Sequence, residues 1–472
     1  MRILVVTHDT PFDRGSGVAV YCHDLETELL RRGHDVVHLF SAERDWRMVP
    51  HLRWSVEQGI TVASLVNAPQ PPTRSPERPL NDCAHPRVER LFEACLGRAR
   101  PDLVHIHSLR GLPGSVVPLA RRHGLPVVVT LHDFWPICAR GLLIRANGDP
   151  CPGPDGGRNC ARFCADHGPL RRRLYRRMEA LAPSGRPREL LQRVRARVMQ
   201  AIPGDHGPWT APPGRPGQNS PDPSAIAAHG TRAASLLRSL REASAILAVS
   251  DFVQDRLVHH GVPEGSIQVL RLGLSLPAVR WRARQPRTPV RIGFLGRVVP
   301  LKGARILAEA VRGIPPDRAR VLFFGPAAAE AVTELVAAAG RPLEFRGPYR
   351  REDLAEILDE VDIAVVPTLF QETVGLATLE AQAAGIPVVA SRTGAIPEHV
   401  ENGTNGLLFE PGDARALGQR LRMLIDTPEL AAAMSARTVP PMAIGRHVDL
   451  LADVYRRCLD AQTRSPYAVH SA

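Results

Sequence analysis

Short apolar runs alternate with stretches of helical spacing along most of the chain. In the first such stretch, Val18, Cys22, Leu25 and Leu29 recur every three or four residues, which places them on one face of a helix. Gly33 follows and favours the end of that helix. We predict strands on either side of this helix and further along the first half, at 2–6, 35–40, 60–65, 102–107, 126–131 and 245–250.

The second half repeats the same plan. Apolar runs ending in Gly, Pro or Ser alternate with helical patterns, and this alternation is typical of parallel sheets built from βαβ units. We therefore predict an α/β protein with two doubly wound, Rossmann-like domains. The strands expected in the second domain cover 290–296, 320–325, 343–347, 362–367 and 387–391.

The expected boundaries follow from this pattern and from local composition. A Pro- and Gly-rich middle makes residues 166–235 an insertion that we expect to be partly mobile. The last helical pattern lies beyond the second sheet, so it can cross back to the first domain. The predicted parts are an N-terminal domain at 1–165, the insertion at 166–235, the end of that domain and a linker at 236–285, a C-terminal domain at 286–440, and a final helix at 441–462.

Length and charge narrow the classes of function. A chain of 472 residues suits two domains, and no apolar run is long enough to cross a membrane. The start is typical of a first strand and not of a secretion signal, so we expect a cytoplasmic protein.

The net charge is +12, and residues 169–200 hold ten Arg against two Glu. This segment suits peripheral contact with an anionic membrane, or it is only a solvated insertion.

Glycines follow the first predicted strand. Gly15 and Gly17 open the next helix, where backbone N–H groups favour an anion. The third glycine of a dinucleotide fingerprint is missing, as is an acidic residue at the end of the second strand, which argues against an oxidoreductase. Asp9 and Arg14 lie in the same loop, where we expect them to meet an acceptor substrate.

Two cations follow the strand predicted at 290–296. Gly296 ends that strand, and Arg297 and Lys302 lie in the loop that enters the next helix. An arginine binds two phosphate oxygens at once and a lysine adds a point charge, so this loop suits a diphosphate. The alternative is a pair of surface cations.

Two carboxylates lie across a loop and the helix after it. Glu372 follows the strand predicted at 362–367, and Glu380 lies eight residues later, among small and apolar neighbours that make a purely solvated role improbable. The helix begins between them and offers backbone N–H groups to a phosphate. This arrangement predicts that the two carboxylates contact different parts of one ligand.

These motifs resemble the retaining glycosyltransferases of family 4, which have the GT-B fold of two Rossmann-like domains facing across a cleft. The resemblance covers about 1–165 and 236–460, and it rests on the E-x7-E pair, the GR…KG loop and the glycine-rich first loop. Leu272 replaces an Asn that is common in the family, and Val374 replaces a frequent Phe.

The resemblance implies a role for each motif. Glu380 would hold the ribose of a UDP- or GDP-type sugar donor, and Glu372 would hold the transferred sugar. Arg297, Lys302 and the helix N-terminus would stabilise the leaving diphosphate without a catalytic metal. The donor-binding residues expected on this basis are Gly296, Tyr349, Thr373, Val374, Gly375, Leu376 and Glu380. The acceptor, from glycans to lipid-linked or small natural products, is not fixed by any of these residues.

His132 ends the strand predicted at 126–131, on the side where open α/β sheets bind ligands. By resemblance it would contact the donor sugar, as a catalytic residue beside Glu372, Arg297 and Lys302. For His107, at the end of the preceding strand, a structural role is the better interpretation.

Two other functions stay open: a sugar-nucleotide epimerase of the same fold, and a non-enzymatic anion- or nucleic-acid-binding protein. Aromatic residues are scarce in the Arg-rich segment, so we do not expect a nucleic-acid partner.

Four cysteines follow His132 within a short stretch. Cys138, Cys151, Cys160 and Cys164 supply the four thiols of a structural zinc site, although their spacing is irregular. Pairing in disulfides and packing as free thiols are the alternatives. Any zinc here would fix the loop and take no part in catalysis.

Overall fold

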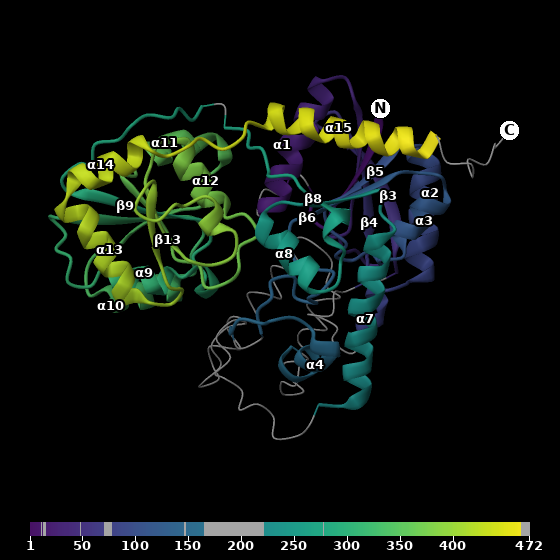
Figure 1. The fold of residues 1–472 in the computed structure, drawn as a ribbon, viewed down its shortest axis with the longest axis horizontal. Helices are drawn as coiled ribbons and strands as arrows, with labels where there is room; N and C mark the ends of the chain where they lie inside the picture. Colours follow the sequence, from purple (N-terminus) through teal and green to yellow (C-terminus); the bar gives the residue numbers. More distant parts are fainter. Residues whose placement is uncertain are drawn as a thin grey trace. The chain divides into compact units, whose positions relative to one another are not determined.

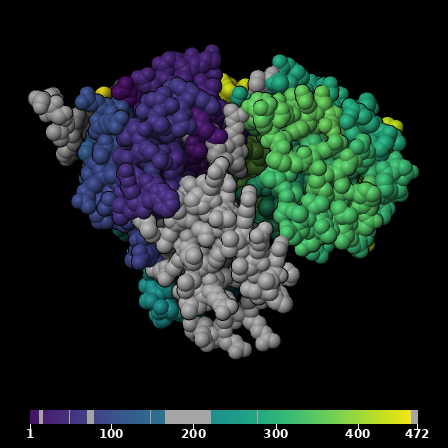
Figure 2. Space-filling view, turned by 180° about the vertical axis from the view of Figure 1, so that it is seen from behind, coloured from purple at the N-terminus to yellow at the C-terminus, as the bar shows by residue number. Residues whose placement is uncertain are grey.

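The computed structural model describes residues 1–10, 12, 16–47, 49–69, 78–145, 148–164, 221–276 and 278–463. The chain forms two compact units (Figure 1). The first comprises Met1–Val249, Val253–Arg271 and the C-terminal part from Ile444, and the second comprises Ser250–Phe252 and Leu272–Ala443. In the space-filling view, purple and blue spheres belong to the first unit and light green spheres to the second (Figure 2).

The first unit is built on an eight-stranded sheet in the order β3-β4-β2-β1-β5-β6-β7-β8 within the described chain. Its pairs are parallel apart from β3 with β4. The central strands are apolar and buried on both faces, as parallel strands covered by helices must be. The strands are β1 Arg2–Val6, β2 Asp35–Phe40, β3 His51–Glu57, β4 Ile60–Val66, β5 Leu103–Ile106, β6 Val127–Leu131, β7 Ala245–Ala248 and β8 Ile267–Val269.

The helices of this unit lie between its strands along the chain, except α15, which follows the second unit (Figure 1). They are α1 Gly17–Arg31, α2 Pro86–Ala99, α3 Val116–Arg122, α4 Arg158–Phe163, α7 Pro223–Arg241, α8 Asp251–His259 and α15 Ile444–Thr463. Single 3-10 turns lie at η1 Pro79–Asp82, η2 Asp155–Gly157 and η3 Glu264–Ser266.

Strand β3 was not expected from the sequence. It pairs antiparallel with β4 through a tight hairpin at Gln58 and Gly59, whose φ angles are 51° and 82°. Two positive φ values in succession are typical of the turn that matches the twist of a hairpin. The edge strand itself is largely exposed, so it lacks the apolar pattern by which the other strands of the sheet were recognised.

Helix α7 begins inside the segment that was expected to be an insertion, so the first unit resumes before residue 236. Its buried Arg232 donates from Nε to the Asp82 carboxylate at 2.6 Å and from Nη2 to the Trp135 carbonyl at 3.0 Å. Burial raises the pKa of Asp82 to about 6, even though Arg232 opposes the shift. The ion pair ties α7 to η1, and the bond to the Trp135 carbonyl ties α7 to the loop after β6. The expected Arg-rich contact segment, 169–200, lies outside the described residues.

Helix α15, the last helix among the described residues, belongs to the first unit and packs against α1. The Tyr21 hydroxyl lies 2.7 Å from His447 Nε2, and His447 Nδ1 lies 2.9 Å from the Arg271 carbonyl. Further along, the Tyr455 hydroxyl lies 2.6 Å from His105 Nδ1 on β5. The contacts with Tyr21 and His105 fix α15 against residues that are more than 300 positions away in the sequence, and the contact with Arg271 spans 176 positions.

The second unit contains a parallel six-stranded sheet in the order β11-β10-β9-β12-β13-β14 within the described chain. This order reverses between β9 and β12, as in a doubly wound dinucleotide-binding fold. Separate apolar clusters cover its two faces. The strands are β9 Val290–Leu295, β10 Ala319–Phe324, β11 Glu344–Gly347, β12 Ile363–Val366, β13 Val388–Ser391 and β14 Gly406–Phe409, the last of which was not expected.

The helices of this unit follow its strands in turn (Figure 1). They are α9 Ala304–Ala310, α10 Ala329–Ala339, α11 Leu354–Asp359, α12 Leu376–Ala383, α13 Ala414–Asp426 and α14 Pro428–Ala436. Single turns lie at η4 Pro300–Lys302, η5 Arg351–Asp353 and η6 Ile396–Glu398.

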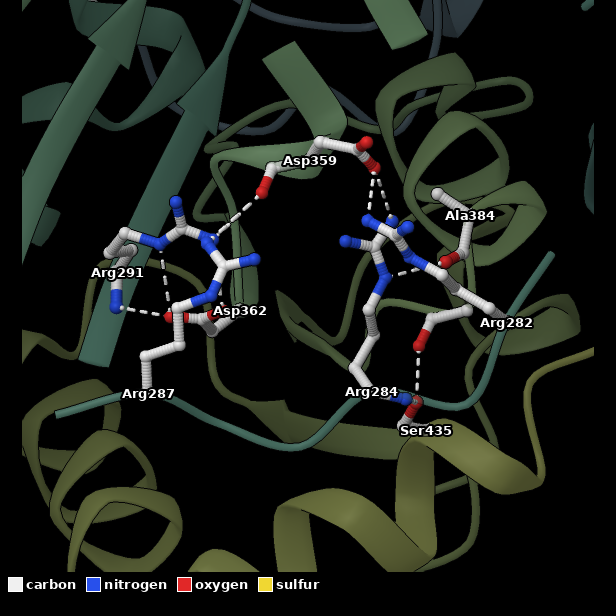
Figure 3. A network of polar contacts seen from close by, with 9 residues as sticks. Arg282, Arg284, Arg287, Arg291, Asp359, Asp362, Ala384 and Ser435 are labelled. Atoms are coloured by element: carbon white, nitrogen blue, oxygen red, sulfur yellow. Dashed lines mark hydrogen bonds and ion pairs between the residues drawn. The ribbon is translucent and has the colours of Figure 1, made fainter. Parts of the chain in front are cut away.

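The expected boundary at 285/286 differs from the observed one, because the second unit begins at Leu272. Arg284 explains the difference, since it is buried against this unit (Figure 3). Its Nε donates to the Ala384 carbonyl at 2.9 Å, and its Nη2 lies 3.3 Å from Asp359 Oδ1. A buried guanidinium needs such partners, so the segment around it is an integral part of this unit and not a linker.

A second half of the same polar network lies at the amino ends of β9 and β12 (Figure 3). Arg291 donates from its backbone N to Asp362 Oδ2 at 2.9 Å and from Nη2 to the Asp359 carbonyl at 2.7 Å. Burial raises the pKa of Asp362 to about 6. No helix among the described residues is both long and apolar enough to span a bilayer.

Candidate functional site

The candidate donor site lies at the carboxyl ends of β9 and β12, where the strand order of the second sheet reverses. Open α/β sheets bind ligands at this topological switch point, because the loops after the two strands diverge there. The β9 loop carries Arg297 and Lys302, and the β12 loop carries Glu372. The topology therefore brings the two strongest sequence motifs to one edge of one sheet.

The two loops are held together by their backbones. Leu369 N donates to the Leu301 carbonyl at 2.9 Å. Gly303 ends the η4 turn with φ +75°, and a Cβ added there would lie 1.7 Å from the Pro367 carbonyl oxygen. Only glycine permits this approach, so the glycine after Lys302 fixes the distance between the cation loop and the carboxylate loop.

The backbone of Glu372 is fixed in a similar way from its other side. Ala395 N donates to the Glu372 carbonyl at 2.8 Å. Gly394 has φ +58°, and a Cβ added there would lie 2.1 Å from the same carbonyl oxygen. The loop after β13 thus locks the loop after β12, and Glu372 is only 9% exposed.

Lys302 and Glu372 form an ion pair. Lys302 Nζ lies 2.7 Å from Glu372 Oε1, and the same Nζ lies 4.9 Å from the centre of the Phe370 ring. The Lys302 side chain is 39% exposed and the Glu372 side chain 11%. The carboxylate is therefore nearly buried, whereas its cation partner stays accessible to a second anion.

The backbone between the two carboxylates forms the N-terminus of α12. Thr373 and Val374 precede Gly375, which is the N-cap residue with φ 79°, and Leu376 is the first helical residue. No side chain of the described chain caps this end of the helix. Helix N-termini present unpaired N–H groups and a partial positive charge, which is the arrangement that binds phosphate.

Glu380 lies in the middle of α12 and is 8% exposed. Arg351 Nη1 donates to Glu380 Oε1 at 2.6 Å. Tyr349 is close to both side chains, and burial, with Glu380 as a further cause, raises the pKa of its hydroxyl. Tyr349 also packs against an apolar cluster of this sheet, so its ring is part of the packing as well as a predicted base contact.

Arg297 and Gly296 complete the first loop. The Gly296 backbone N donates to the Phe324 carbonyl at 2.8 Å, which ends β9 beside β10. The Arg297 side chain is exposed and has no ion-pair partner within the described part of the chain. A guanidinium without a carboxylate keeps all of its donors for an anionic ligand.

In the first unit, His132 follows β6 and is 8% exposed. Its Nε2 lies 2.9 Å from Nδ1 of His107, and its ring lies 5.0 Å from that of Tyr21, centre to centre. Burial lowers the pKa of His132 to about 3 and holds that of His107 well below its usual range. Two neutral imidazoles suit this contact, because one nitrogen must donate and the other must accept.

The loop after β1 contributes less. His8 Nε2 lies 2.9 Å from Asp9 Oδ2. Burial raises the pKa of Asp9, but the bond and charge of His8, the bond from Ser16 and the charge of Arg110 together outweigh burial and leave the pKa below its usual value. Gly17 is the first residue of α1, which is capped by Ser16 through its bond from Ala19 N at 3.2 Å. The other two predicted acceptor residues, Arg14 and Gly15, lie outside the described residues.

The four cysteines after His132 come near one another. Burial, together with the thiols of Cys164, Cys138 and Cys151, raises the pKa of Cys160 to about 12. All four are free thiols in this structure. No three His, Cys, Asp or Glu side chains of the described chain are arranged to hold a metal ion. Structural zinc stays a prediction, which metal analysis of protein purified without added zinc would test.

The structure also identifies site residues that sequence reasoning missed. Arg351 was not expected, because nothing in its local sequence marks it as the partner of a residue 29 positions away. The contact between His107 and His132 was not predicted either, although His107 lies at the carboxyl end of β5, beside β6. The structural role of His107 stays a prediction.

Two family models match successive parts of the chain. The model described as glycosyl transferase 4-like domain matches residues 16–193, and the one described as glycosyl transferases group 1 matches residues 289–427. The first match falls in the first unit, apart from undescribed residues, and the second match falls in the second unit.

Curated relatives are similar over parts of the chain. A D-inositol 3-phosphate glycosyltransferase from Streptomyces avermitilis is 29% identical over 255 residues, which cover 48% of this chain and 55% of the relative. The provisionally named colanic acid biosynthesis glycosyltransferase WcaL from Escherichia coli K12 is 32% identical over 204 residues, which cover 40% of this chain and 50% of the relative. The chain thus spans about half the length of these relatives.

Solved structures of other proteins align with nearly the whole of this chain. A sucrose-phosphate synthase from Thermosynechococcus elongatus has a TM-score of 0.63 at 16% identity and covers 98% of this chain and 99% of its own. HepE from Anabaena, in complex with UDP and glucose, has a TM-score of 0.60 at 16% identity, and the match covers 97% of this chain and 99% of the HepE chain.

Two Rossmann-like units, one of which carries cations and carboxylates at its switch point, define a two-domain α/β protein of the GT-B fold. This confirms the predicted fold class. With both family models matched in order along it, the chain belongs to the GT-B glycosyltransferases of the group 1 and 4-like type.

Proposed function

We propose that this protein transfers a sugar from a nucleotide-diphosphate sugar to a hydroxyl acceptor, with retention of the anomeric configuration. The observation that carries the proposal is the second unit's switch point. Two loops at this edge carry Lys302 and Arg297, and α12 begins between two nearly buried carboxylates in the sequence, Glu372 and Glu380. Cations and helix N–H groups suit a diphosphate, and the two carboxylates suit the hydroxyls of the sugar and the ribose that the diphosphate joins.

The chemistry follows from where charge develops. The bond between the sugar C1 and the diphosphate oxygen breaks, and its electron pair goes to the leaving diphosphate. The acceptor oxygen bonds to C1 on the same face, and its proton goes to the departing phosphate. Cations and helix N–H groups that contact the bound diphosphate stabilise this charge, a contribution of about 3–4 kcal/mol for each well-placed donor.

Lys302 must change partner for this step. In the structure its ammonium is paired with Glu372, and its exposed side chain leaves a path toward a diphosphate. A donor that brings both a diphosphate and sugar hydroxyls gives each member of the pair a new partner: the phosphate for Lys302, and a hydroxyl for Glu372. The pair is therefore suited to separate when the donor binds.

The names of the relatives guide the choice of substrates. HepE was solved with UDP, which makes UDP-sugars the first donors to test, followed by GDP-sugars. Several relatives are named for D-inositol 3-phosphate, which makes that compound the first acceptor. A lipid-linked or glycan acceptor is the alternative, in line with WcaL.

The test measures donor consumption and product formation over a panel of nucleotide sugars, with and without the acceptors. Glu372→Gln is expected to lower kcat by about 100-fold or more while the protein stays folded, because the hydroxyl contact is lost in the transition state. Glu309→Gln, at a partly exposed helix position of the same unit, is the matched control. Retention is read from the anomeric proton of the product by NMR.

Each alternative function has its own result. A sugar-nucleotide epimerase would convert the donor without any acceptor and would release no free nucleoside diphosphate. A non-enzymatic anion-binding protein would bind the nucleotide sugar but leave it intact. If Glu372→Gln transfers sugar as fast as the wild type, the assignment of this site is wrong.

A further inference from the structure

A salt bridge inside the second unit joins Arg351 to Glu380. Arg351 Nη1 lies 2.6 Å from Glu380 Oε1, and the two side chains are 16% and 10% exposed. A carboxylate removed from water to this degree needs a partner to remain charged, and charge-assisted bonds of this kind are short and directional. Arg351 therefore supplies the positively charged partner that the Glu380 carboxylate needs.

The backbone holds Arg351 in place. It is the first residue of the η5 turn, and Arg350 N donates to Asp353 Oδ2 at 3.0 Å to cap that turn. Buried Leu354 then starts α11 and anchors it to the apolar cluster on one face of the sheet. The position of Arg351 is thus set before any ligand arrives.

The guanidinium also has a second acceptor. Arg351 Nη2 donates to the Ser275 carbonyl at 3.2 Å, in addition to the bond from Nη1 to Glu380. A planar guanidinium bound at two of its nitrogens cannot rotate freely. The direction of its bond to Glu380 is fixed in turn, and with it the orientation of the carboxylate.

We propose that Arg351 is a positioning residue that orients Glu380 for the ribose of the donor, and that it thereby determines specificity for ribonucleotide over 2′-deoxyribonucleotide sugars. This inference rests on the proposed function. The ribose diol offers two hydroxyl donors to the carboxylate, and a 2′-deoxyribose offers one. Arg351 does not touch the reacting atoms and acts through Glu380.

The test uses the full-length protein and the ratio of kcat/KM for a nucleotide sugar to that for its 2′-deoxyribose analogue. Wild type is expected to favour the ribose form by about 10- to 100-fold, the range for a hydrogen bond to a charged group. Arg351→Gln is expected to reduce this ratio toward one, as is Glu380→Gln. Arg351→Lys, which keeps the charge, is expected to restore part of it.

The ratio separates positioning from a merely structural role. Both kcat/KM values come from the same preparation, so a loss of folded protein cancels. The double variant Arg351→Gln/Glu380→Gln is expected to show the same ratio as Glu380→Gln alone, because Arg351 acts only through that carboxylate. Arg320→Gln, which breaks the exposed pair with Glu344 in the same unit, is the control and is expected to leave the ratio unchanged.

Three results would overturn the inference in different ways. If Glu380→Gln loses the preference and Arg351→Gln keeps it, Glu380 acts on the ribose without Arg351. If both variants keep the preference, Glu380 does not read the ribose. If the wild type transfers sugar from none of the donors, the proposed function itself fails, and this inference fails with it.

Discussion

The buried histidines of the first unit predict a specific sensitivity to acid. His447 on α15 is 1% exposed, and its two ring nitrogens contact the Tyr21 hydroxyl and the Arg271 carbonyl. Burial lowers the pKa of His447 to about 4. The same imidazole in the unfolded chain titrates at about 6.5. Protonation therefore favours the unfolded state as the pH falls from 6.5 toward 4.

The size of the effect follows from these two values. A depressed pKa gives stability that is present above pH 6.5 and is lost as the pH falls toward 4. At pH 7 the loss from His447 is only about 0.2 kcal/mol, whereas at pH 5 it reaches about 2 kcal/mol. His132, whose pKa is about 3, adds a loss of similar size at pH 5.

The perturbation that isolates one of these residues is His447→Gln. A glutamine amide can donate to the Arg271 carbonyl and accept from the Tyr21 hydroxyl, but it does not titrate. The variant is expected to lose about 2 kcal/mol less stability than the wild type between pH 7 and pH 5. At pH 7 it is expected to be less stable, because the amide fits the site of a ring imperfectly.

The assay is equilibrium urea unfolding of the full chain at pH 5 and pH 7, followed by a hydrogen-exchange pulse at one fixed pH. Peptides from β5 and α15 report the first unit, and peptides from β9 and β12 report the second. Glutamine at exposed His123 serves as the control and should not alter the pH dependence. The reasoning is refuted if His447→Gln and the wild type lose the same stability over this pH range.

Three further predictions each concern the substitution of a single residue. Lys302→Met should lower kcat for sugar transfer by about 100- to 1,000-fold, because the leaving diphosphate loses a cation. Gly394→Ala should reduce both activity and stability, since its Cβ would lie 2.1 Å from the Glu372 carbonyl oxygen. Arg232→Met should destabilise the first unit by about 3–5 kcal/mol, measured by urea unfolding, because it leaves Asp82 buried without its partner.

Each of these predictions has a matched control and a contrary outcome. Arg305→Met changes an exposed cation on α9 and should leave kcat unchanged; an equal loss in both variants would contradict the role of Lys302. Gly403→Ala shares the positive φ of Gly394 but meets no atom within 4 Å, so it should cost less stability. Adding Asp82→Asn should recover part of the stability lost in Arg232→Met, and no recovery would contradict the ion-pair explanation.

Much of the fold was predictable because its signals are local. The buried strands β1, β5, β6, β9, β12 and β13 are continuous apolar runs, and each was predicted to within one or two residues of its observed ends. The edge strand β3 is largely exposed and β8 has only three residues, so neither carries an apolar pattern of useful length. Helix α7 was placed in the insertion because its start follows a Pro- and Gly-rich stretch.

The same difference between local and long-range signals applies to the residues of the candidate site. Glu372, Glu380, Arg297 and Lys302 were found because a loop after a buried strand and the helix that follows it are set by neighbouring residues. The pairing of each carboxylate was not found, since Lys302 is 70 positions from Glu372 and Arg351 is 29 positions from Glu380. Local sequence gives no measure of such distances.

The order of the amino acids is enough to predict the two α/β units, the residue types at the switch point and the family to which the chain belongs. The folded structure was needed to learn which cation pairs with which carboxylate, that α15 packs against α1, and that His132 contacts His107. Strands and helices follow from hydrogen bonding and burial within a few residues. Ion pairs and histidine contacts depend instead on where separate elements meet once the sheets have formed.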